Sequence, residues 1–148
     1  MKLLLPPIAF IPLALAGCGT STHVDKLFTV PELVANIDTL NGRTVSVTGY
    51  LGTCAGYECE LFVDEAGRDA WRRHIDAISR RASPQPEAPL WLGIGHGDGF
   101  DRKAAPFQNR NVTITGKVTN RCRYFGHPAC ADRSTDIEPV DIIPSKDN

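Results

Sequence analysis

The chain has 148 residues, with 16 basic against 17 acidic side chains and a formal net charge of −1. Apolar residues make up 42% of the chain and charged residues 22%, which is ordinary for a folded domain and argues against disorder or a multi-pass membrane protein. A dedicated nucleic-acid-binding protein is usually strongly basic, so the near-neutral charge argues against that class as well.

The first 17 residues have the pattern of a secretory signal. A lysine at position 2 is followed by an apolar run over residues 3–16, which is too short to span a bilayer as a helix. The run ends in Leu15-Ala16-Gly17-Cys18, which resembles the lipobox of bacterial lipoproteins. The resemblance implies cleavage before Cys18 and attachment of acyl chains there, and several chains anchor a protein stably. Because the next residue is glycine and not aspartate, it also implies the outer membrane, facing the periplasm.

The lipoprotein resemblance also divides the chain into parts. We expect a signal peptide over residues 1–17, a lipidated N-terminus and tether over residues 18–29, a folded domain over residues 30–144 and a tail over residues 145–148. The residues directly after the lipidated cysteine are small and polar, which is typical of a flexible tether. The first partner of the protein is therefore expected to be a membrane, through the N-terminal lipid.

The first half of the folded region predicts a short helix and a β-hairpin. A proline and a glutamate in its first turn favour a helix over residues 31–36. Residues 44–51 alternate polar and apolar side chains, which predicts a half-buried strand, and Gly49 within it indicates a bulge or a bend. Residues 58–64 predict a second strand, and the short turn between the two strands indicates a hairpin.

The second half begins with a helix predicted over residues 69–82. Trp71, Ile75 and Ile78 recur at helical spacing, and Asp69 is the expected cap. Four arginines are predicted on the opposite face of this helix, where they meet solvent or a polyanion: Arg72, Arg73, Arg80 and Arg81. The remaining elements are a strand, one or two helical turns and two more strands, over residues 90–94, 101–107, 111–119 and 137–143.

Two of the predicted strands resemble each other. Residues 40–49 and residues 107–116 share Arg, Val, Thr and Gly in register, so we expect two equivalent, glycine-bent strands of one barrel. Together with the Val-x-Val-x-Gly element at residues 45–49, this pattern resembles the OB-fold of bacterial periplasmic proteins. The expected fold class is mainly β with one or two helices, an OB-like five-stranded Greek-key barrel. The helix over residues 69–82 departs from that fold and would be an insertion.

Besides the lipidated cysteine the chain has four cysteines, an even number that favours disulfides in an exported domain. The simplest pairing joins Cys54 to Cys59 and Cys122 to Cys130, because each pair brackets a turn-rich segment. Pairing between the two loops, such as Cys54 with Cys122, stays open under the OB-fold resemblance. A metal site that joins the thiolates to His127 is the alternative, although neither spacing is that of a compact zinc knuckle.

The OB-fold resemblance implies that the two cysteine loops flank a ligand face. Three aromatic side chains in these loops are candidate ligand contacts: Tyr57, Tyr124 and Phe125. The predicted function is a lipid-anchored periplasmic binding or interaction domain without enzymatic activity. The expected partner is an envelope protein or a glycan, and neither a cofactor nor a nucleic acid is expected.

A hydrolase is the alternative function. An acidic run supplies carboxylates for acid–base chemistry: Glu58, Glu60, Asp64 and Glu65. His96 is the titratable group that would act with them. The sequence has no serine nucleophile elbow, and it does not assign a catalytic residue.

Overall fold

The computed structural model describes residues 26–97, 99–123, 130 and 133–146. The expected signal peptide, the lipobox and Cys18 lie outside these residues. So do the candidate contacts Tyr124 and Phe125, and His127 of the alternative metal site.

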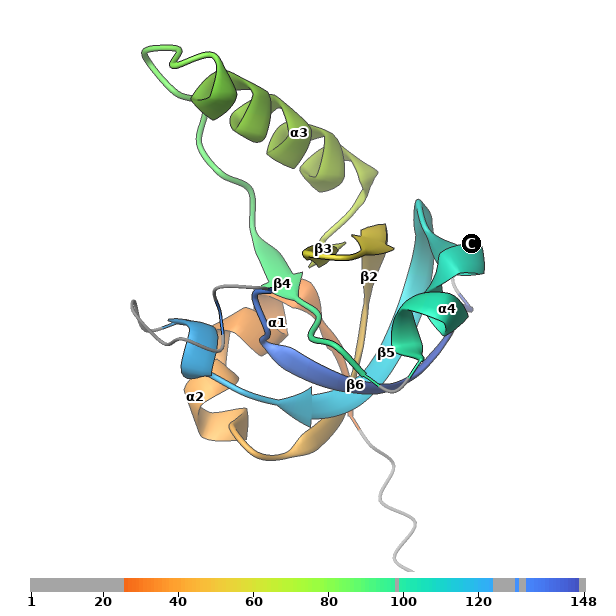
Figure 1. The fold of residues 1–148 in the computed structure, drawn as a ribbon. Helices are drawn as coiled ribbons and strands as arrows, with labels where there is room; N and C mark the ends of the chain where they lie inside the picture. The colour runs from red at the N-terminus through yellow and green to blue at the C-terminus, as the bar shows by residue number, and fades with distance from the viewer. Residues whose placement is uncertain (1–25, 98, 124–129, 131–132, 147–148) are drawn as a thin grey trace, which may run out of the picture.

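The described chain is mainly β, with a few short helices and one long helix (Figure 1). In chain order the elements are β1 (Leu27–Thr29), α1 (Val30–Ala35), α2 (Ile37–Leu40), β2 (Thr44–Ala55), β3 (Glu58–Phe62), α3 (Glu65–Ser79), β4 (Trp91–Gly93), α4 (Phe100–Ala104), a 3-10 turn η1 (Ala105–Phe107), β5 (Arg110–Val118), a second 3-10 turn η2 (Arg121–Arg123) and β6 (Ile137–Pro144). All five predicted strands are present, and β1 and α2 are additions that the sequence pattern did not indicate. The sheet begins at Leu27, within the segment expected to be a tether.

The strands within the described residues form one six-stranded sheet with the order β4-β3-β2-β5-β6. Neighbours along this path are antiparallel, and β1 adds to β2 in parallel. The sheet is not closed, because its two end strands meet at an isolated parallel bridge between Ile94 and Ile137 and not along a strand pairing. Two backbone hydrogen bonds flank this bridge, from Gly95 N to Ile137 O and from Asp136 N to Gly93 O, each 2.8 Å long.

Strand β2 is the centre of the sheet, since it pairs with three other strands. The side that faces away from β5 pairs with β1 as far as Thr48 and with β3 from Tyr50 onward. Gly49 lies at the change of partner, where a Cβ atom would lie 2.5 Å from the carbonyl oxygen of Phe62. The predicted bend at this glycine therefore has a steric reason, because β3 crosses too closely for any side chain.

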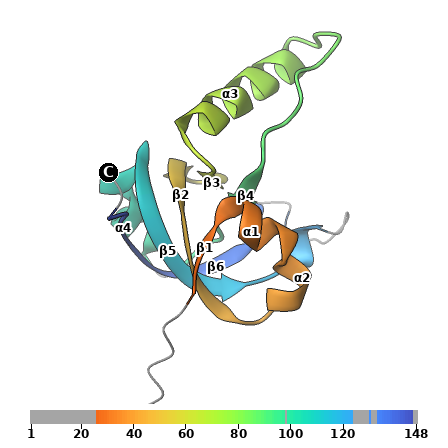
Figure 2. The ribbon, with the colours of Figure 1, turned by 180° about the vertical axis from the view of Figure 1, so that it is seen from behind.

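The core lies between the curved sheet and the short helices. Leu33 of α1 and Phe100 of α4 are almost fully buried against the inward-facing residues of β2, β3 and β5. In Figure 2, α1 and α2 lie together beside β1, whereas α3 projects away from the rest of the fold. The one long helix is therefore not a core helix.

Helix α3 differs from its prediction at both ends. It begins at Glu65 and not at Asp69, because the Asp64 side chain caps it by accepting a 2.8 Å hydrogen bond from Gly67 N. Gly67 in the first turn weakens the helical pattern there, and the sequence pattern therefore indicates a later start than the structure has. The helix ends at Ser79, and Arg81 adopts a left-handed conformation with φ 54°.

Both cysteine pairs lie at disulfide distance in the local pairing. The Sγ atoms are 2.01 Å apart in Cys54–Cys59 and 2.07 Å apart in Cys122–Cys130. The first disulfide links directly opposed residues of the β2–β3 hairpin, and both of its cysteines are buried in the core. It therefore fixes the tip of this hairpin, next to the site described below.

Candidate ligand-binding groove

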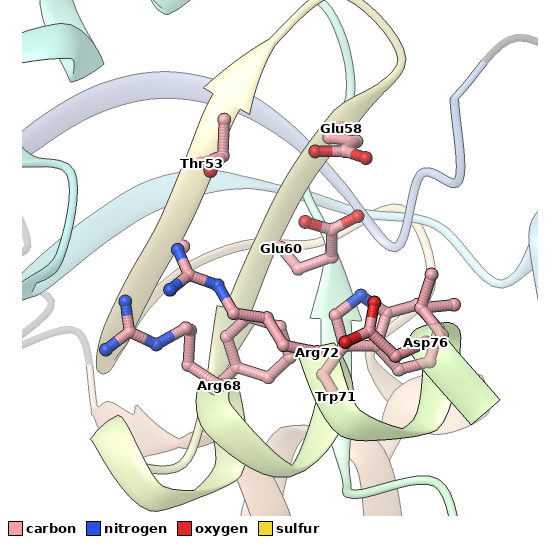
Figure 3. A pocket seen from close by; sticks show the side chains of 10 residues that line it. Thr53, Glu58, Glu60, Arg68, Trp71, Arg72 and Asp76 are labelled. Atoms are coloured by element: carbon pink, nitrogen blue, oxygen red, sulfur yellow. The ribbon is translucent and has the colours of Figure 1, made fainter. Parts of the chain in front are cut away.

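A groove lies between the β2–β3 hairpin and α3, and we call it the β3–α3 groove (Figure 3). Its volume is about 250 Å³. The side chains that decide its chemistry come from all three elements: Thr53 from β2, Glu58 and Glu60 from β3, and Trp71, Arg72 and Ile75 from α3. The groove is thus formed where the long helix stands over the outer face of the sheet.

The alternation of strand β3 separates its core residues from its groove residues. Cys59 and Leu61 are buried on the inner face, whereas Glu58 and Glu60 lie on the outer face. Figure 3 shows the two carboxylates following one another along the strand. Residue 52 on the neighbouring strand is glycine, and a Cβ atom there would lie 2.9 Å from the Phe62 ring, so the floor of the groove is tightly packed.

Arg68 attaches the first turns of α3 to the sheet and is the only buried residue of this fully described helix. Its Nη1 donates to Oδ1 of Asn109, and its Nη2 donates to Oε1 of Glu65 over 3.1 Å. Its Nε lies 2.8 Å from Oδ1 of Asp69, an ion pair in which Nε makes no hydrogen bond. The guanidinium also lies 5.4 Å from the centre of the Tyr50 ring. These contacts fix one end of the groove.

The rest of α3 leaves its apolar stripe open. Ile75 is 41% exposed and Ile78 is 43% exposed. Trp71 is partly buried, with its ring centre 5.3 Å from that of Trp91. The predicted stripe is therefore present, but the sheet does not cover it.

The arginines of α3 do not all lie where they were predicted. Arg72 lines the groove beside Trp71 and not the opposite face of the helix. Figure 3 shows its side chain directed toward the β2 side. Arg80 forms an exposed ion pair of 3.8 Å with Asp76, and Arg73 is exposed.

The groove contains a carboxyl group with a strongly altered acidity. The pKa of Glu60 is raised to about 7, mainly by burial and also by the neighbouring Glu58 carboxylate, while the attraction of Arg133 and a hydrogen bond from the backbone of Glu60 oppose the shift. Within the described residues neither Glu58 nor Glu60 forms an ion pair or a hydrogen bond with another side chain. The groove thus holds two neighbouring acidic groups that no cation of the described residues contacts.

The other predicted site residues lie elsewhere. Tyr57 is at the tip of the β2–β3 hairpin, 76% exposed and outside the lining of the groove. Asp64 caps α3, and Glu65 accepts a 3.3 Å hydrogen bond from the Tyr50 hydroxyl, so half of the acidic run serves the start of the helix. His96 lines a different cavity of about 370 Å³ together with Arg121.

Two further observations concern metals and membranes. Within the part of the chain that the structure describes, no three side chains of the metal-binding types are grouped together. None of the described helices has the length and apolar character needed to cross a bilayer.

Sequence reasoning missed the two arginines that organise this region. Arg68 directly precedes the helix predicted over residues 69–82, and no sequence pattern marks it as an anchor. Arg133 follows the second disulfide in a segment without periodicity. Their partners are 41 and up to 79 residues away. No local signal could have indicated such contacts.

The fold and the site together define a small β-sheet domain with a groove between its central hairpin and a projecting helix. Comparisons of the chain with known protein families, with curated proteins and with solved structures found no match.

Proposed function

We propose that the protein is an exported, lipid-anchored domain that binds a component of the cell envelope in the β3–α3 groove, without catalysing a reaction. The observation that carries the proposal is the open apolar stripe of α3. A surface helix normally buries such a stripe against the core, yet Trp71 and Ile75 face a groove of about 250 Å³. A ligand that enters the groove would supply the missing contact.

The proposal includes an OB-like arrangement of the strands. The order β4-β3-β2-β5-β6, together with the parallel bridge from Ile94 to Ile137, supports a partly open five-stranded Greek-key barrel to which β1 is added. OB-folds bind ligands on the face of their second and third strands, beside the loop that joins the first two. Strands β3 and β4 would hold those positions, and the groove lies over β3. Helix α3 would then be an insertion that deepens the binding face.

The proposed location rests on the lipobox and on the cysteines. The sequence Leu15-Ala16-Gly17-Cys18 supports lipid attachment at the outer membrane, on the periplasmic side. Two cysteine pairs at disulfide distance support maturation in an oxidising compartment. The residues between Cys18 and β1 would tether the domain close to the membrane surface.

One observation favours the hydrolase as a second candidate. A carboxyl group with a pKa of about 7 next to a second carboxylate is suited to general acid–base chemistry. We rank this function second because Glu60 and His96 line different cavities. Conversion of a bound ligand that stops in the Glu60→Gln protein would favour the hydrolase, and unchanged recovery of the ligand would favour the binding domain.

Two measurements test the proposed function. Mass spectrometry of the protein isolated from bacterial envelopes should find acyl chains on an N-terminal Cys18, and the absence of lipid would overturn the anchoring. A photo-crosslinking amino acid at Ile75, within the groove, should attach to an envelope component in living cells. The same probe at Val140, which is 64% exposed on β6 and outside the groove, should not. Equal labelling at both positions, or none, would overturn the groove as the binding site.

A further inference from the structure

Among the described residues, no cation pairs with the two glutamates of the β3–α3 groove. Glu58 and Glu60 project from the same face of β3, and no side chain of the described residues pairs with either of them. A half-buried carboxylate without a partner is unfavourable, because the protein does not replace the water that it loses. The groove therefore presents a site for a positive charge that the described part of the chain leaves open.

The cations nearby are engaged or lie apart from the carboxylates. Arg68 is held by Asn109, Glu65 and Asp69 at one end of the groove. Arg72 lines the same groove and is exposed, and its side chain extends toward the β2 side in Figure 3 without forming an ion pair with either glutamate. Within the described residues no cation pairs with Glu58 or Glu60, so a positive group from another molecule can reach them in the groove.

Arg133 attracts Glu60 only through its charge, because its guanidinium contacts Asp101 and backbone carbonyl oxygens. Asp76, the third carboxylate of the groove, already pairs with Arg80. The open charge site is thus limited to the two glutamates of β3.

The apolar wall of the groove indicates what carries the positive charge. Trp71, whose indole stacks on His74 and packs against Trp91, offers a fixed apolar wall. Ile75 beside it offers an aliphatic contact. The volume of about 250 Å³ lies below the range of typical small-molecule sites, about 300–1,000 Å³, and so suits one side-chain-sized group. A flexible aliphatic stem with a charged end matches these features.

We propose that the β3–α3 groove binds a primary ammonium group on a short aliphatic stem, with the ammonium between Glu58 and Glu60 and the stem against Trp71 and Ile75. The lysine side chain of a peptide and a free diamine share this chemistry. The inference rests on the proposed function, because it names the ligand class of the same groove.

The proposal predicts how binding depends on pH. The groups that face Glu60 are Glu58 on its own strand, Arg68, Arg72 and Asp76 on α3, and Arg133. An ammonium group binds the ionised form of Glu60, so below pH 7 the ligand must displace a proton. Affinity should therefore rise by up to about tenfold per pH unit between pH 5 and pH 7 and become constant above that range.

Calorimetric titration of the full-length, detergent-solubilised protein tests the ligand class. The probes are 1,5-diaminopentane, the tripeptide Ala-Lys-Ala and, as an anionic control of similar length, pentanoate. Both amines should bind at pH 8, and pentanoate should not. Tighter binding of the tripeptide would identify a peptide as the source of the ammonium group, and tighter binding of the diamine would identify a free amine. Equal binding of pentanoate, or no binding of either amine, would overturn the inference.

Matched variants connect the binding to the two glutamates. Glu60→Gln should weaken amine binding about tenfold and remove its dependence on pH. Glu58→Gln should weaken amine binding by a smaller factor. Because Glu58 is exposed and the fold tolerates change there, this variant keeps the test valid if Glu60→Gln fails to fold. Glu87→Gln removes one carboxylate from the exposed loop after α3 and should bind as the original protein does. A loss of the same size in all three variants would overturn the assignment.

The titrations also separate this inference from the proposed function. Crosslinking at Ile75 without amine binding would leave the binding domain in place and remove only the ammonium ligand. Failure of both experiments would remove both.

Discussion

The guanidinium of Arg133 is buried, and its Nη1 donates to both carboxylate oxygens of Asp101 over 3.0 Å. Its Nε donates to the carbonyl oxygen of Ile94 at the end of β4 over 2.7 Å, and its Nη1 lies 3.3 Å from the carbonyl oxygen of Gly56 in the hairpin turn. Its Nη2 lies 3.1 Å from Sγ of Cys54. One side chain therefore holds the hairpin tip, the end of β4 and α4 together.

Replacement of Arg133 should destabilise the fold strongly. Arg133→Met leaves the Ile94 carbonyl oxygen and the 36% exposed Asp101 carboxylate without their donor, and each buried polar group left unpaired costs about 1–3 kcal/mol. Urea denaturation measures the free energy of unfolding. The control is Arg80→Met, which breaks the exposed ion pair with Asp76 and should cost less than about 1 kcal/mol. Equal effects of the two variants would contradict the structural role of Arg133.

A methyl group at Gly116 should also destabilise the sheet. Its Cβ would lie 2.5 Å from Cγ2 of Ile137 and 2.6 Å from the carbonyl oxygen of Glu138, so β6 would have to move. We expect Gly116→Ala to cost about 1–3 kcal/mol in thermal or urea unfolding. Gly67→Ala is the control, because its Cβ would meet its nearest atom at 3.5 Å and alanine favours the helix by up to about 1 kcal/mol. The prediction fails if Gly116→Ala is as stable as the original protein.

The sheet was predictable because its longer strands alternate and two of them resemble each other. Strands β2 and β5 pair antiparallel, with Val45 opposite Gly116 and Gly49 opposite Val112. The two similar segments are therefore direct neighbours, and each glycine lies where a third strand crosses closely. The short β1 and α2 were missed, because three or four residues are too few to show a period.

The groove was predictable only in part. The acidic run and the Trp71 stripe were visible in the sequence, since both are local patterns. Their meeting in one groove depends on where α3 lies over the sheet, and the hydrogen bond from Arg68 to Asn109, which attaches the first turns of α3, spans 41 residues. Contacts of this length leave no pattern in a single sequence.

The disulfides allow a direct chemical test. Thiol titration of the denatured, unreduced protein should find no free thiol among the cysteines at positions 54, 59, 122 and 130, and four free thiols would favour the alternative metal site. Since Cys54 and Cys59 are buried in the core, the variant with alanine at both positions should lose about 2–4 kcal/mol of stability. Urea denaturation checks this value, and chemical reduction of the original protein should lower stability in the same direction.

The raised pKa of Glu60 gives a stability prediction whose sign can be worked out. An unfolded glutamate titrates near 4.5, whereas burial and Glu58 raise the pKa in the folded protein to about 7. Between these values the folded state binds more protons than the unfolded state, so stability falls as the pH rises. The contribution of neutral Glu60 is fully present below pH 4.5 and is lost as the pH passes 7.

Glutamine keeps the neutral form at every pH, so Glu60→Gln should be more stable than the original protein at pH 8. The gain should be on the order of 1 kcal/mol, because partial exposure of the carboxyl group screens its charge. At pH 4.5 the two proteins should be equally stable. Glu32→Gln is a control of opposite sign, since hydrogen bonds from Thr29 lower the pKa of Glu32. The Glu32 carboxylate stabilises the start of α1 at neutral pH and loses this effect as the pH falls. A gain in stability from Glu32→Gln at pH 8 would show that glutamine stabilises the protein at any position, and it would contradict the explanation by burial of Glu60.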